Sequence, residues 1–362
     1  MLFSPGVLGR RQERDRIRPM KKLPIFLLLF ICSCAQKALA PSSTGLVERA
    51  AAAMGSEIHL TAWTADEPAA AAAFDAVFQE MDRLENVMST WREKSDIARL
   101  NAAAGLHPVQ VSTEVRDVLQ TARQVSDWTG GKFDVTFAAL SGLWKFDYQD
   151  KDNTIPDRKE VAQRLAFINY RDVDVDEKSG TAFLKRKGMR VNLGGIAKGY
   201  AVDRAAGILR QRGFHDFIIQ FGGDMYVAGK RGDRPWRVAI RDPRGLGEQI
   251  FASMDLADST FTTSGDYERF FMKDGRRYHH IIDPATGDPA SGCRSVTIVA
   301  DRAVLADALS TGVFILGPEA GMALIEKLPG VEGVIVSAKN DVLISSGLKA
   351  KLTLLAAPTN AP

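Results

Sequence analysis

The sequence predicts an α+β fold: a single compact, two-lobed domain with a mainly antiparallel sheet and flanking helices. Segments with the two-residue period of strands are mixed with segments that have the spacing of amphipathic helices. They do not follow the strict strand–helix–strand alternation that produces a parallel sheet. No internal repeat or long low-complexity linker divides the 362 residues, and a hydrophobic fraction of 45% is sufficient for a sizeable core.

The first 33 residues are predicted to be a leader. Met20 precedes two lysines, and residues 23–31 form an apolar run that is too short to span a bilayer comfortably and has the proportions of a secretory signal. We expect translation to start at Met20. Seven of the 47 Lys and Arg and two of the 44 Asp and Glu lie in residues 1–33, which leaves 40 basic and 42 acidic residues. This balance gives no indication of a nucleic-acid partner.

Residues 31–34 (ICSC) resemble a lipobox, in which a small residue precedes the cysteine that is lipidated. We therefore expect Cys34 to carry a lipid anchor, with residues 34–47, rich in Ala, Ser, Pro and Gly, as a tether. The alternative cleavage site follows Ala40, but Pro41 is usually unfavourable there. A lipoprotein at the periplasmic face of the cell membrane is thus favoured over simple secretion.

The elements of the domain, residues 48–350, are expected in a mixed order. Helices are predicted at 67–88, before Gly105, at 115–129, 157–166, 196–213, 303–316 and 318–328. Strands are predicted at 54–63, twice within 173–193, at 216–230 and 235–243, after Ala257, and near 333–344. Pro68 fits the first turn of the long first helix, and Gly130 and Gly131 stop the helix before them. Residues 133–147 have no clear period, and residues 351–362 are expected to be a flexible tail.

Cysteine and histidine are scarce, and this narrows the possible chemistry. Cys293 is the one thiol beyond the anchor region, which excludes an internal disulfide and a cysteine-based zinc site in the mature domain. Two of the five histidines are adjacent in YHHIIDPATG, residues 278–287. Because the Asp-Pro turn holds this segment rigid, a general acid or base near neutral pH is expected at His280, or at His279 on the opposite strand face. Two strand histidines without a catalytic role are the alternative.

Two glycine-rich corners could approach a ligand closely. LGGIAKGY, residues 193–200, lies between a strand and a helix, where a helix N-terminus attracts anions, although a tight structural turn is an equally good interpretation. Lys198 in its first turn opposes the helix dipole, which favours an anionic partner. In FGGDMYVAG, residues 221–229, Asp224 could reach a polar ligand, or the glycines could form a simple bulge. The hydroxyl-rich segment 262–271 reads as a loop when taken alone.

Asp307 and Thr311 lie four residues apart in AVLADALSTGVFIL, so both side chains leave one face of the predicted helix. A carboxylate, a hydroxyl and a nearby carbonyl are the oxygen ligands that Mg²⁺ prefers. Taken alone, the pair is better explained as a surface acid and a packed threonine.

Several motifs in order identify a resemblance that no single motif could support. These are MGS (54–56), STWREKSDIARLN (89–101), FDVT (133–136), LGGIAKGYAVD (193–203), GGD (222–224), TSGDYE (263–268), HHIIDPATG (279–287) and ADALSTG (306–312). Their order resembles that of the ApbE family of FAD:protein FMN transferases, over about residues 54–344. The resemblance implies an Mg²⁺-dependent enzyme that transfers FMN from FAD to a Thr or Ser hydroxyl of an acceptor protein and releases AMP.

The resemblance also implies the roles of individual residues. Asp307, Thr311 and the carbonyl of Gly195 would bind the metal, and His280 resembles the family's catalytic histidine. The expected FAD contacts are Met54, Trp91, Asp134, Thr136, Asn192, Lys198 and Ile282. Asn192 stands where many members have Asp, and Trp91 replaces a common Tyr, which keeps the stacking surface but removes the hydroxyl.

The resemblance leaves three activities open. Besides the transferase, the chain could be a pyrophosphatase that converts FAD to FMN and AMP, or a periplasmic flavin-binding lipoprotein without catalysis. The acceptor implied for a transferase is a subunit of a membrane redox complex, such as a sodium-pumping NADH:quinone reductase or an Rnf complex.

Overall fold

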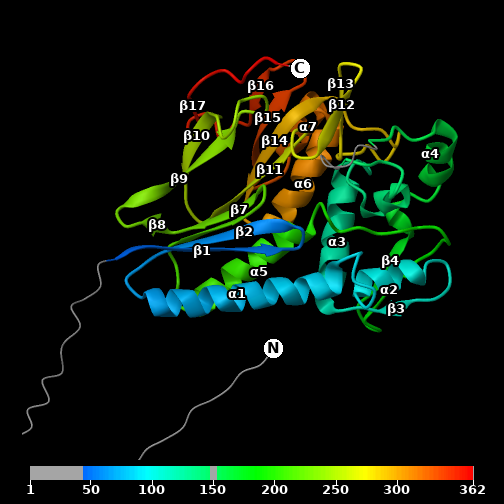
Figure 1. Cartoon of the computed structure of the whole chain (residues 1–362), viewed down its shortest axis with the longest axis horizontal. Helices are drawn as coiled ribbons and strands as arrows, with labels where there is room; N and C mark the ends of the chain where they lie inside the picture. The colour runs from blue at the N-terminus through cyan, green and yellow to red at the C-terminus, as the bar shows by residue number, and fades with distance from the viewer. Residues whose placement is uncertain (1–43, 147–152, 362) are drawn as a thin grey trace, which may run out of the picture. The chain divides into compact units, whose positions relative to one another are not determined.

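The computed structural model describes residues 44–146 and 153–361, and it confirms the α+β class with antiparallel sheets (Figure 1). The main sheet has eight strands in the spatial order β1 (Gly45–Ala53), β2 (Ser56–Thr64), β6 (Phe217–Phe221), β7 (Asp224–Ala228), β11 (Ser259–Gly265), β14 (Cys293–Ala300), β15 (Glu332–Ser337) and β16 (Val342–Ile344). Every neighbouring pair in this sheet is antiparallel. The strands predicted at 54–63, 216–230 and 333–344 thus belong to one continuous sheet, whereas those predicted within 173–193 and at 235–243 lie in smaller sheets.

Three smaller sheets surround the main one. They contain β17 (Thr353–Leu354), β10 (Ile250–Leu256), β9 (Arg234–Arg241) and β8 (Lys230–Arg231); β12 (Phe270–Lys273) and β13 (Arg276–His279); and β3 (Val109–Gln110), β5 (Thr181–Leu184) and β4 (Val173–Asp176). The helices are α1 (Glu67–Met88), α2 (Asp96–Ala102), α3 (Thr113–Trp128), α4 (Arg158–Leu165), α5 (Ala197–Gln211), α6 (Ala303–Leu316) and α7 (Pro318–Ile325), with 3₁₀ turns η1 (Val135–Leu140) and η2 (Tyr170–Asp172). In Figure 1, α1 and α5 run alongside β1 and β2, and α6 stands at the centre.

The helix ends follow from their sequences. Asp66, Ser95 and Ser112 each accept a hydrogen bond from a backbone N–H in the first turn of α1, α2 and α3. The third helix therefore begins at Thr113, two residues before the predicted start. The segment 133–147, which showed no period, contains the 3₁₀ turn η1, whose first N–H groups are capped by Asp134.

Strand β1 begins earlier than the predicted domain start. Residues 45–53 pair with β2 along their whole length, although residues up to 47 were expected to be tether. β1 is an edge strand, and most of its residues are exposed or half-buried. It lacks the alternation that a half-buried strand shows, because its run of alanines gives little contrast between the faces.

The C-terminal segment needs a correction as well, because residues 351–361 do not form a flexible tail. Thr353 and Leu354 pair with β10, and the backbone N–H and Oγ1 of Thr359 both donate to Asp242, at 2.9 and 2.7 Å. Arg294 donates to the carbonyl oxygen of Thr359 at 3.1 Å. These are long-range contacts, which local sequence patterns do not reveal.

These contacts belong to what we call the C-terminal cluster, made of Asp242, Arg244, Asp266, Arg294 and Thr359. Arg244 and Asp266 form a bidentate ion pair, with both N–O distances 2.7 Å and side chains only 7% and 8% exposed. Asp242 also accepts from the backbone N–H of Arg244 at 2.9 Å. The last residues of the chain are thus tied to the turn that follows β11.

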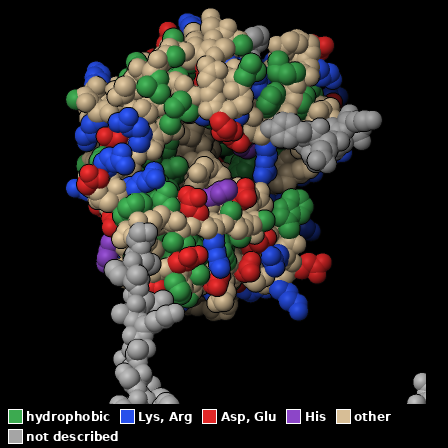
Figure 2. Space-filling view, turned by 60° about the vertical axis from the view of Figure 1, so that its left-hand side comes forward, with side chains coloured by type: hydrophobic (Ala, Val, Ile, Leu, Met, Phe, Trp, Pro, Cys, Tyr) green, Lys and Arg blue, Asp and Glu red, His purple; other side chains and the backbone are tan. Residues whose placement is uncertain are grey.

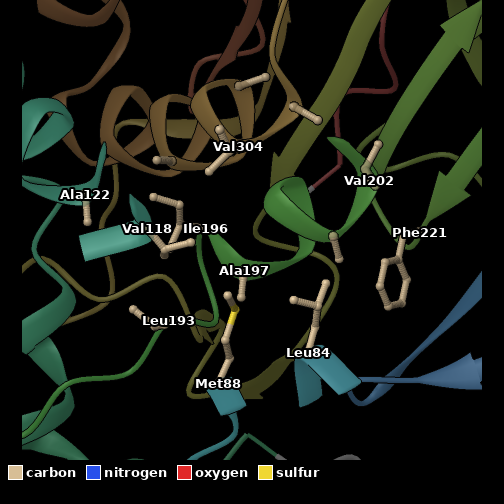
Figure 3. Packing of buried hydrophobic residues seen from close by; sticks show 14 of the residues in the cluster. Leu84, Met88, Val118, Ala122, Leu193, Ile196, Ala197, Val202, Phe221 and Val304 are labelled. Atoms are coloured by element: carbon tan, nitrogen blue, oxygen red, sulfur yellow. The ribbon is translucent and has the colours of Figure 1, made fainter. Parts of the chain in front are cut away.

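The core lies between the main sheet and the helices α1, α3, α5 and α6. Figure 3 shows Leu84 and Met88 of α1, Leu193 and Ile196 of the glycine-rich corner, and Val304 of α6 gathered in this packing. Burial of such side chains is the main stabilising contribution to a domain of this size. The corner is therefore held by the core on the side away from the solvent.

The surface is hollowed on one side. Figure 2 shows a depression near the centre of the face turned to the viewer, with acidic and basic side chains around it. Within residues 44–146 and 153–361, no helix has both the length and the apolar character needed to cross a bilayer. The predicted leader and Cys34 lie outside the described residues.

Candidate active site

The candidate site lies where α5 and α6 meet the strands β7 and β11. The two helices approach closely at Gly199, where an added Cβ would lie 2.2 Å from the carbonyl oxygen of Ala303 and 2.7 Å from Cβ of Asp307. Asp203 of α5 accepts hydrogen bonds from the N–H groups of Ala303 and Val304, at 2.7 and 3.0 Å. This carboxylate caps the N-terminus of α6 and fixes it against α5.

The three predicted metal ligands come together. The carboxylate of Asp307 is 4% exposed and accepts from the N–H of Gly199 at 2.9 Å. Thr311 lies one helical turn further, and an added Cβ on Gly195 would be 3.5 Å from its Oγ1. Thr311 Oγ1 is also 3.3 Å from Oγ of Ser264 on β11. Asp307 and Thr311 thus lie one turn apart on α6, with Gly195 beside Thr311, and a set of one carboxylate, one hydroxyl and one backbone carbonyl has the oxygen chemistry that suits a hard cation such as Mg²⁺.

Lys198 forms an ion pair with Asp224, the first residue of β7. The Lys198 side chain keeps 28% of its surface exposed, whereas that of Asp224 keeps 1%. Lys198 therefore lies towards the solvent and Asp224 lies behind it. We call Lys198, Asp224 and Asp307 the site cluster.

Burial and neighbouring charges both shift the pKa values of Asp307 and Lys198 in the site cluster. Burial, with the charge of Asp224 next, raises the pKa of Asp307 to about 7, while Lys198 and the Gly199 N–H oppose this shift. Burial disfavours the charged form of Lys198, but the carboxylates of Asp224 and Asp307 outweigh it and raise its pKa above the usual value. Lys198 is therefore charged at neutral pH, and Asp307 is costly to ionise without a cation beside it.

The two histidines have different surroundings. His279 is buried, its Nε2 lies 2.7 Å from the carbonyl oxygen of Ala290, and its ring packs edge-on against Phe314. His280 is half-buried, and its Nδ1 is buried without a hydrogen-bond partner in the described part of the chain. Burial first, and then the neighbouring His279 and Arg269, lower the pKa of His280 to about 4. His280 is therefore neutral at pH 7 and can accept a proton, while His279 is engaged in packing.

The turn that follows His280 is fixed to the rest of the domain. Asp283 accepts from Lys132 Nζ at 2.7 Å and from the N–H of Ala285 at 2.9 Å. Ile282 pairs with Pro289 and packs in a small apolar cluster with Leu140 of η1. Ile282 is only 7% exposed, so its side chain supports this turn.

The expected FAD contacts fall into two groups. Trp91 is 91% exposed, in the loop after α1, and Met54 sits at the β1–β2 turn with φ 47°, where its N–H donates to Glu85 at 3.3 Å. Asn192 Oδ1 accepts from the N–H of Gly194 at 2.7 Å and shapes the glycine-rich corner. The backbone groups and the exposed ring here are open to a ligand.

Asp134 and Thr136 are buried and fully used within the chain. Asp134 accepts from the N–H and the hydroxyl of Thr136, at 2.7 and 2.6 Å, and from the N–H of Tyr170 at 2.9 Å. The hydroxyl of Thr136 in turn accepts from the N–H of Asn169 at 2.8 Å. In this structure the two side chains therefore hold η1 and η2 together, and their predicted contact with FAD stays a prediction.

Three residues of the site were not among the predicted site residues. Asp224 was considered only as a residue that could reach a ligand, and Ser264 lay in a segment that read as a loop. Ser310 is fully buried, donates to the carbonyl oxygen of Asp307 at 2.9 Å, and is 2.8 Å from Oγ of Ser264. The motifs GGD and SGD could have indicated Asp224 and Ser264. However, only the pairing of β7 with β11 places these two residues beside α6.

Groups of three or more His, Cys, Asp or Glu side chains that could hold a metal are not found among the described residues. The expected set of one carboxylate with neutral oxygens is not such a group. Two depressions also lie away from the site cluster, along α3. One of about 430 Å³ is lined by Gln124 and Trp128 among others, and one of about 160 Å³ includes Leu119, Val135 and Tyr170.

The chain is similar to one protein family over most of its length. The family model described as "ApbE family" matches residues 54–335. A relative from Klebsiella pneumoniae (strain 342), named "FAD:protein FMN transferase", is 32% identical over 81% of this chain and 90% of that protein. One from Treponema pallidum (strain Nichols), with the same name, is 35% identical over 78% of this chain and 82% of that protein.

Solved structures agree with these similarities. A structure described as the ApbE protein from Thermotoga maritima superposes with a TM-score of 0.77 at 32% identity and covers 85% of this chain and 99% of its own. "Flavin Transferase ApbE from Vibrio cholerae" gives a TM-score of 0.76 at 28% identity, with the same coverage. Nearly the whole of each of these chains therefore has a counterpart here.

Proposed function

This chain belongs to the ApbE family, and from that premise we propose that it is an FAD:protein FMN transferase. The reaction moves FMN from FAD to a Thr or Ser hydroxyl of an acceptor protein and releases AMP. The hydroxyl oxygen forms a bond to the phosphorus of the FMN half, and the P–O bond to the AMP phosphate breaks. AMP leaves with the electron pair of that bond, and a base takes the hydroxyl proton.

The residues of the site suit these steps. His280 is in its neutral form near pH 7, since burial lowers its pKa to about 4, and the neutral imidazole has a lone pair that can accept the proton of the acceptor hydroxyl. The lowered pKa makes it a weaker base than a free imidazole. Lys198 is charged and partly exposed, so it can donate to an oxygen of the diphosphate while Asp224 holds it from behind. The reaction requires that the FAD diphosphate bind next to His280 and Lys198, so that the acceptor hydroxyl and the phosphorus are held close together.

We further propose that Asp307, Thr311 and the carbonyl of Gly195 hold Mg²⁺. When bound, the ion would supply positive charge that offsets the charge of the diphosphate. Support for this comes from their oxygen-only chemistry and from the raised pKa of Asp307, about 7, which indicates that a nearby cation would favour its ionised form. Thr311 and Gly195 are also in contact, which supports a shared role in binding the ion.

The flavin is proposed to lie against Trp91, whose exposed ring offers a stacking surface, near Met54 and the corner shaped by Asn192. The lipid anchor at Cys34 and the periplasmic face of the membrane also remain proposals, supported by the leader sequence. The acceptor is proposed to be a subunit of a membrane redox complex that carries a Thr or Ser at its flavinylation site.

The observation that carries the proposal is that Lys198 lies close enough to both Asp307 and His280 for their charges to influence one another, in a chain of this family. The test incubates the purified protein with FAD, Mg²⁺ and an acceptor subunit and separates the products. A transferase yields AMP and a fluorescent flavin bound covalently to the acceptor. Free FMN with AMP in the absence of an acceptor would identify a pyrophosphatase, and intact FAD would identify a flavin-binding protein without catalysis.

A further inference from the structure

Asp224 has a buried carboxylate oxygen that the chain leaves unused. Oδ2 is paired with Lys198, but Oδ1 has no hydrogen-bond partner among the residues that the structure describes. The side chain is 1% exposed, and burial of an unpaired carboxylate oxygen is unfavourable. Such an atom next to an ion pair indicates that the site is completed by something outside the chain.

A second unused oxygen lies beside it. Thr262 of β11 stands directly opposite Asp224 of β7 in the strand register, so the two side chains share one face of the sheet. Thr262 is 2% exposed, and its Oγ1 also lacks a partner within the described ranges. Ser264, two residues along the same face, contacts Thr311 of α6. This face of the sheet is therefore the polar wall of the site opposite α6.

The charges of the site cluster do not balance. One lysine and two aspartates, Lys198, Asp224 and Asp307, give a net charge of −1 when all three are ionised. Lys198 lies towards the solvent and Asp224 behind it, as their exposed fractions show. Arg269 is exposed, and its charge influences Lys198 and His280, but solvent screens a group at the surface more than a buried one.

We propose that Asp224 is a positioning residue that couples the binding of the divalent cation to the binding of FAD. It holds Lys198 in place and adds one negative charge to the site cluster, which disfavours binding of the FAD diphosphate alone and favours binding of the cation alone. Cation and diphosphate together are nearly neutral, and they bind better together than either does alone. This inference rests on the proposed function, because it takes FAD as the substrate of this site.

The test compares FAD binding by the wild-type protein and by Asp224→Asn, first in EDTA and then with increasing Mg²⁺. Quenching of flavin fluorescence reports binding without any turnover. Asn keeps the size of the side chain but removes its charge, so we expect metal-free FAD to bind roughly tenfold tighter and Mg²⁺ to improve FAD binding roughly tenfold less. Since linkage is reciprocal, calorimetry with Mg²⁺ must show that FAD improves Mg²⁺ binding to the variant by the same reduced factor. Because the variant lacks one negative charge, Mg²⁺ alone is also expected to bind it more weakly.

Two further variants separate this role from a merely structural one. Asp203→Asn makes the same chemical change in a buried carboxylate that holds α6 against α5 but does not pair with Lys198, so it is expected to shift metal-free FAD affinity much less than Asp224→Asn does. Lys198→Met leaves Asp224 and Asp307 without a positive partner. It is therefore expected to weaken metal-free FAD binding and to increase the benefit from Mg²⁺, which tests the inference even if Asp224→Asn does not fold.

The outcomes distinguish this inference from the proposed function. Suppose that the wild-type protein transfers FMN, but that FAD binding to Asp224→Asn responds to Mg²⁺ as in the wild type. The coupling role of Asp224 is then wrong. If Asp224→Asn does not fold, the same result with Lys198→Met leads to the same conclusion. The same conclusion follows if Asp203→Asn shifts metal-free FAD binding as much as Asp224→Asn does. If the wild type binds FAD with the expected metal dependence but releases no AMP, the proposed transfer is wrong while the coupling stands.

Discussion

The domain contains two groups of largely buried charged side chains, and they differ in the balance of charges and in the pairing of their carboxylates. In the C-terminal cluster, Arg244 uses two nitrogens for the two oxygens of Asp266, and Asp242 is bonded by Thr359. Two arginines and two aspartates make this cluster neutral, although Arg244 Nε lacks a partner among the described residues. The site cluster has two aspartates for one lysine, and Oδ1 of Asp224 lacks a partner within the described ranges.

The difference between the two clusters shows that buried charged side chains can serve either structure or ligand binding. A neutral group contributes mainly to a defined structure, because its carboxylates are bonded within the group. A group with more aspartates than cations and an unpartnered carboxylate oxygen is costly until a ligand arrives, and that cost is typical of functional sites. The two regions approach each other at β11, since Ser264 of β11 contacts Thr311 beside the site cluster and Asp266 of the C-terminal cluster lies in the turn that follows.

The largest effect is expected in the C-terminal cluster. Asp266→Ala leaves Arg244 buried without its partner and is expected to lower the free energy of unfolding by about 3–5 kcal/mol. Urea denaturation measures this change. The double variant Arg244→Met, Asp266→Leu removes both charges and should recover most of the loss. A double variant as unstable as the single one would show that the pair is needed for more than charge balance.

In the site cluster the same kind of change should affect catalysis instead. Asp307→Ala is expected to reduce AMP release by a factor on the order of 10²–10³, corresponding to several kcal/mol of electrostatic stabilisation. Its thermal midpoint should fall much less than that of Asp266→Ala, because the lost hydrogen bond from the Gly199 N–H is offset by removal of a carboxylate whose pKa burial raises to about 7. A large loss of stability with little loss of rate would remove the contrast between the two clusters.

His280 gives a pH test of the site. Its folded-state pKa, about 4, is below the unfolded value of 6.5, so its contribution to stability is present above pH 6.5 and is lost as the pH falls towards 4. Between pH 7 and 4.5 the wild type should therefore lose stability relative to His280→Gln, by on the order of 1–2 kcal/mol. Denaturant titrations at several pH values measure it, and parallel curves for the two proteins would contradict the burial of this imidazole.

The smallest effect is expected at the end of the chain. Thr359→Val removes one hydrogen bond to buried Asp242 and is expected to cost about 1 kcal/mol, with the rate of AMP release unchanged. Arg158→Ala is the matched control, because its ion pair with Asp288 involves an arginine side chain that is 64% exposed. That control should change stability by less than about 0.5 kcal/mol. Equal effects in a urea titration would show that the C-terminal cluster is no better ordered than the surface.

The helices and the class of fold could be predicted because their signals are local. The helix over 67–88 shows its apolar spacing and its Pro68 within a few residues, and the structure confirms these bounds. Strands β1 and β17 were missed because their evidence lies in their partners. An alanine-rich edge strand and a two-residue strand have no period of their own, and only pairing with β2 and β10 defines them.

The site could be predicted in part for the same reason. Asp307 and Thr311 share a helical face, which their spacing reveals. Gly195 as a metal ligand came from the resemblance to a family, and His280 came from its own segment, which left His279 as an alternative. No local rule links either residue to α6. The involvement of Asp224 depends on the register of β7 against β11, a long-range property. For Asp134 the motif suggested a ligand contact, whereas the structure shows its carboxylate hydrogen-bonded within the chain. Those hydrogen bonds could not be predicted from the motif.

The contact between Thr359 and Asp242 spans 117 residues. Until the ribosome has released residue 359, Asp242 and Arg294 lack the partners that this segment supplies. The C-terminal cluster can therefore form only after the whole segment between residues 242 and 359 has left the exit tunnel. A stop codon in place of Pro358 would leave two buried charged side chains without bonds that Thr359 provides.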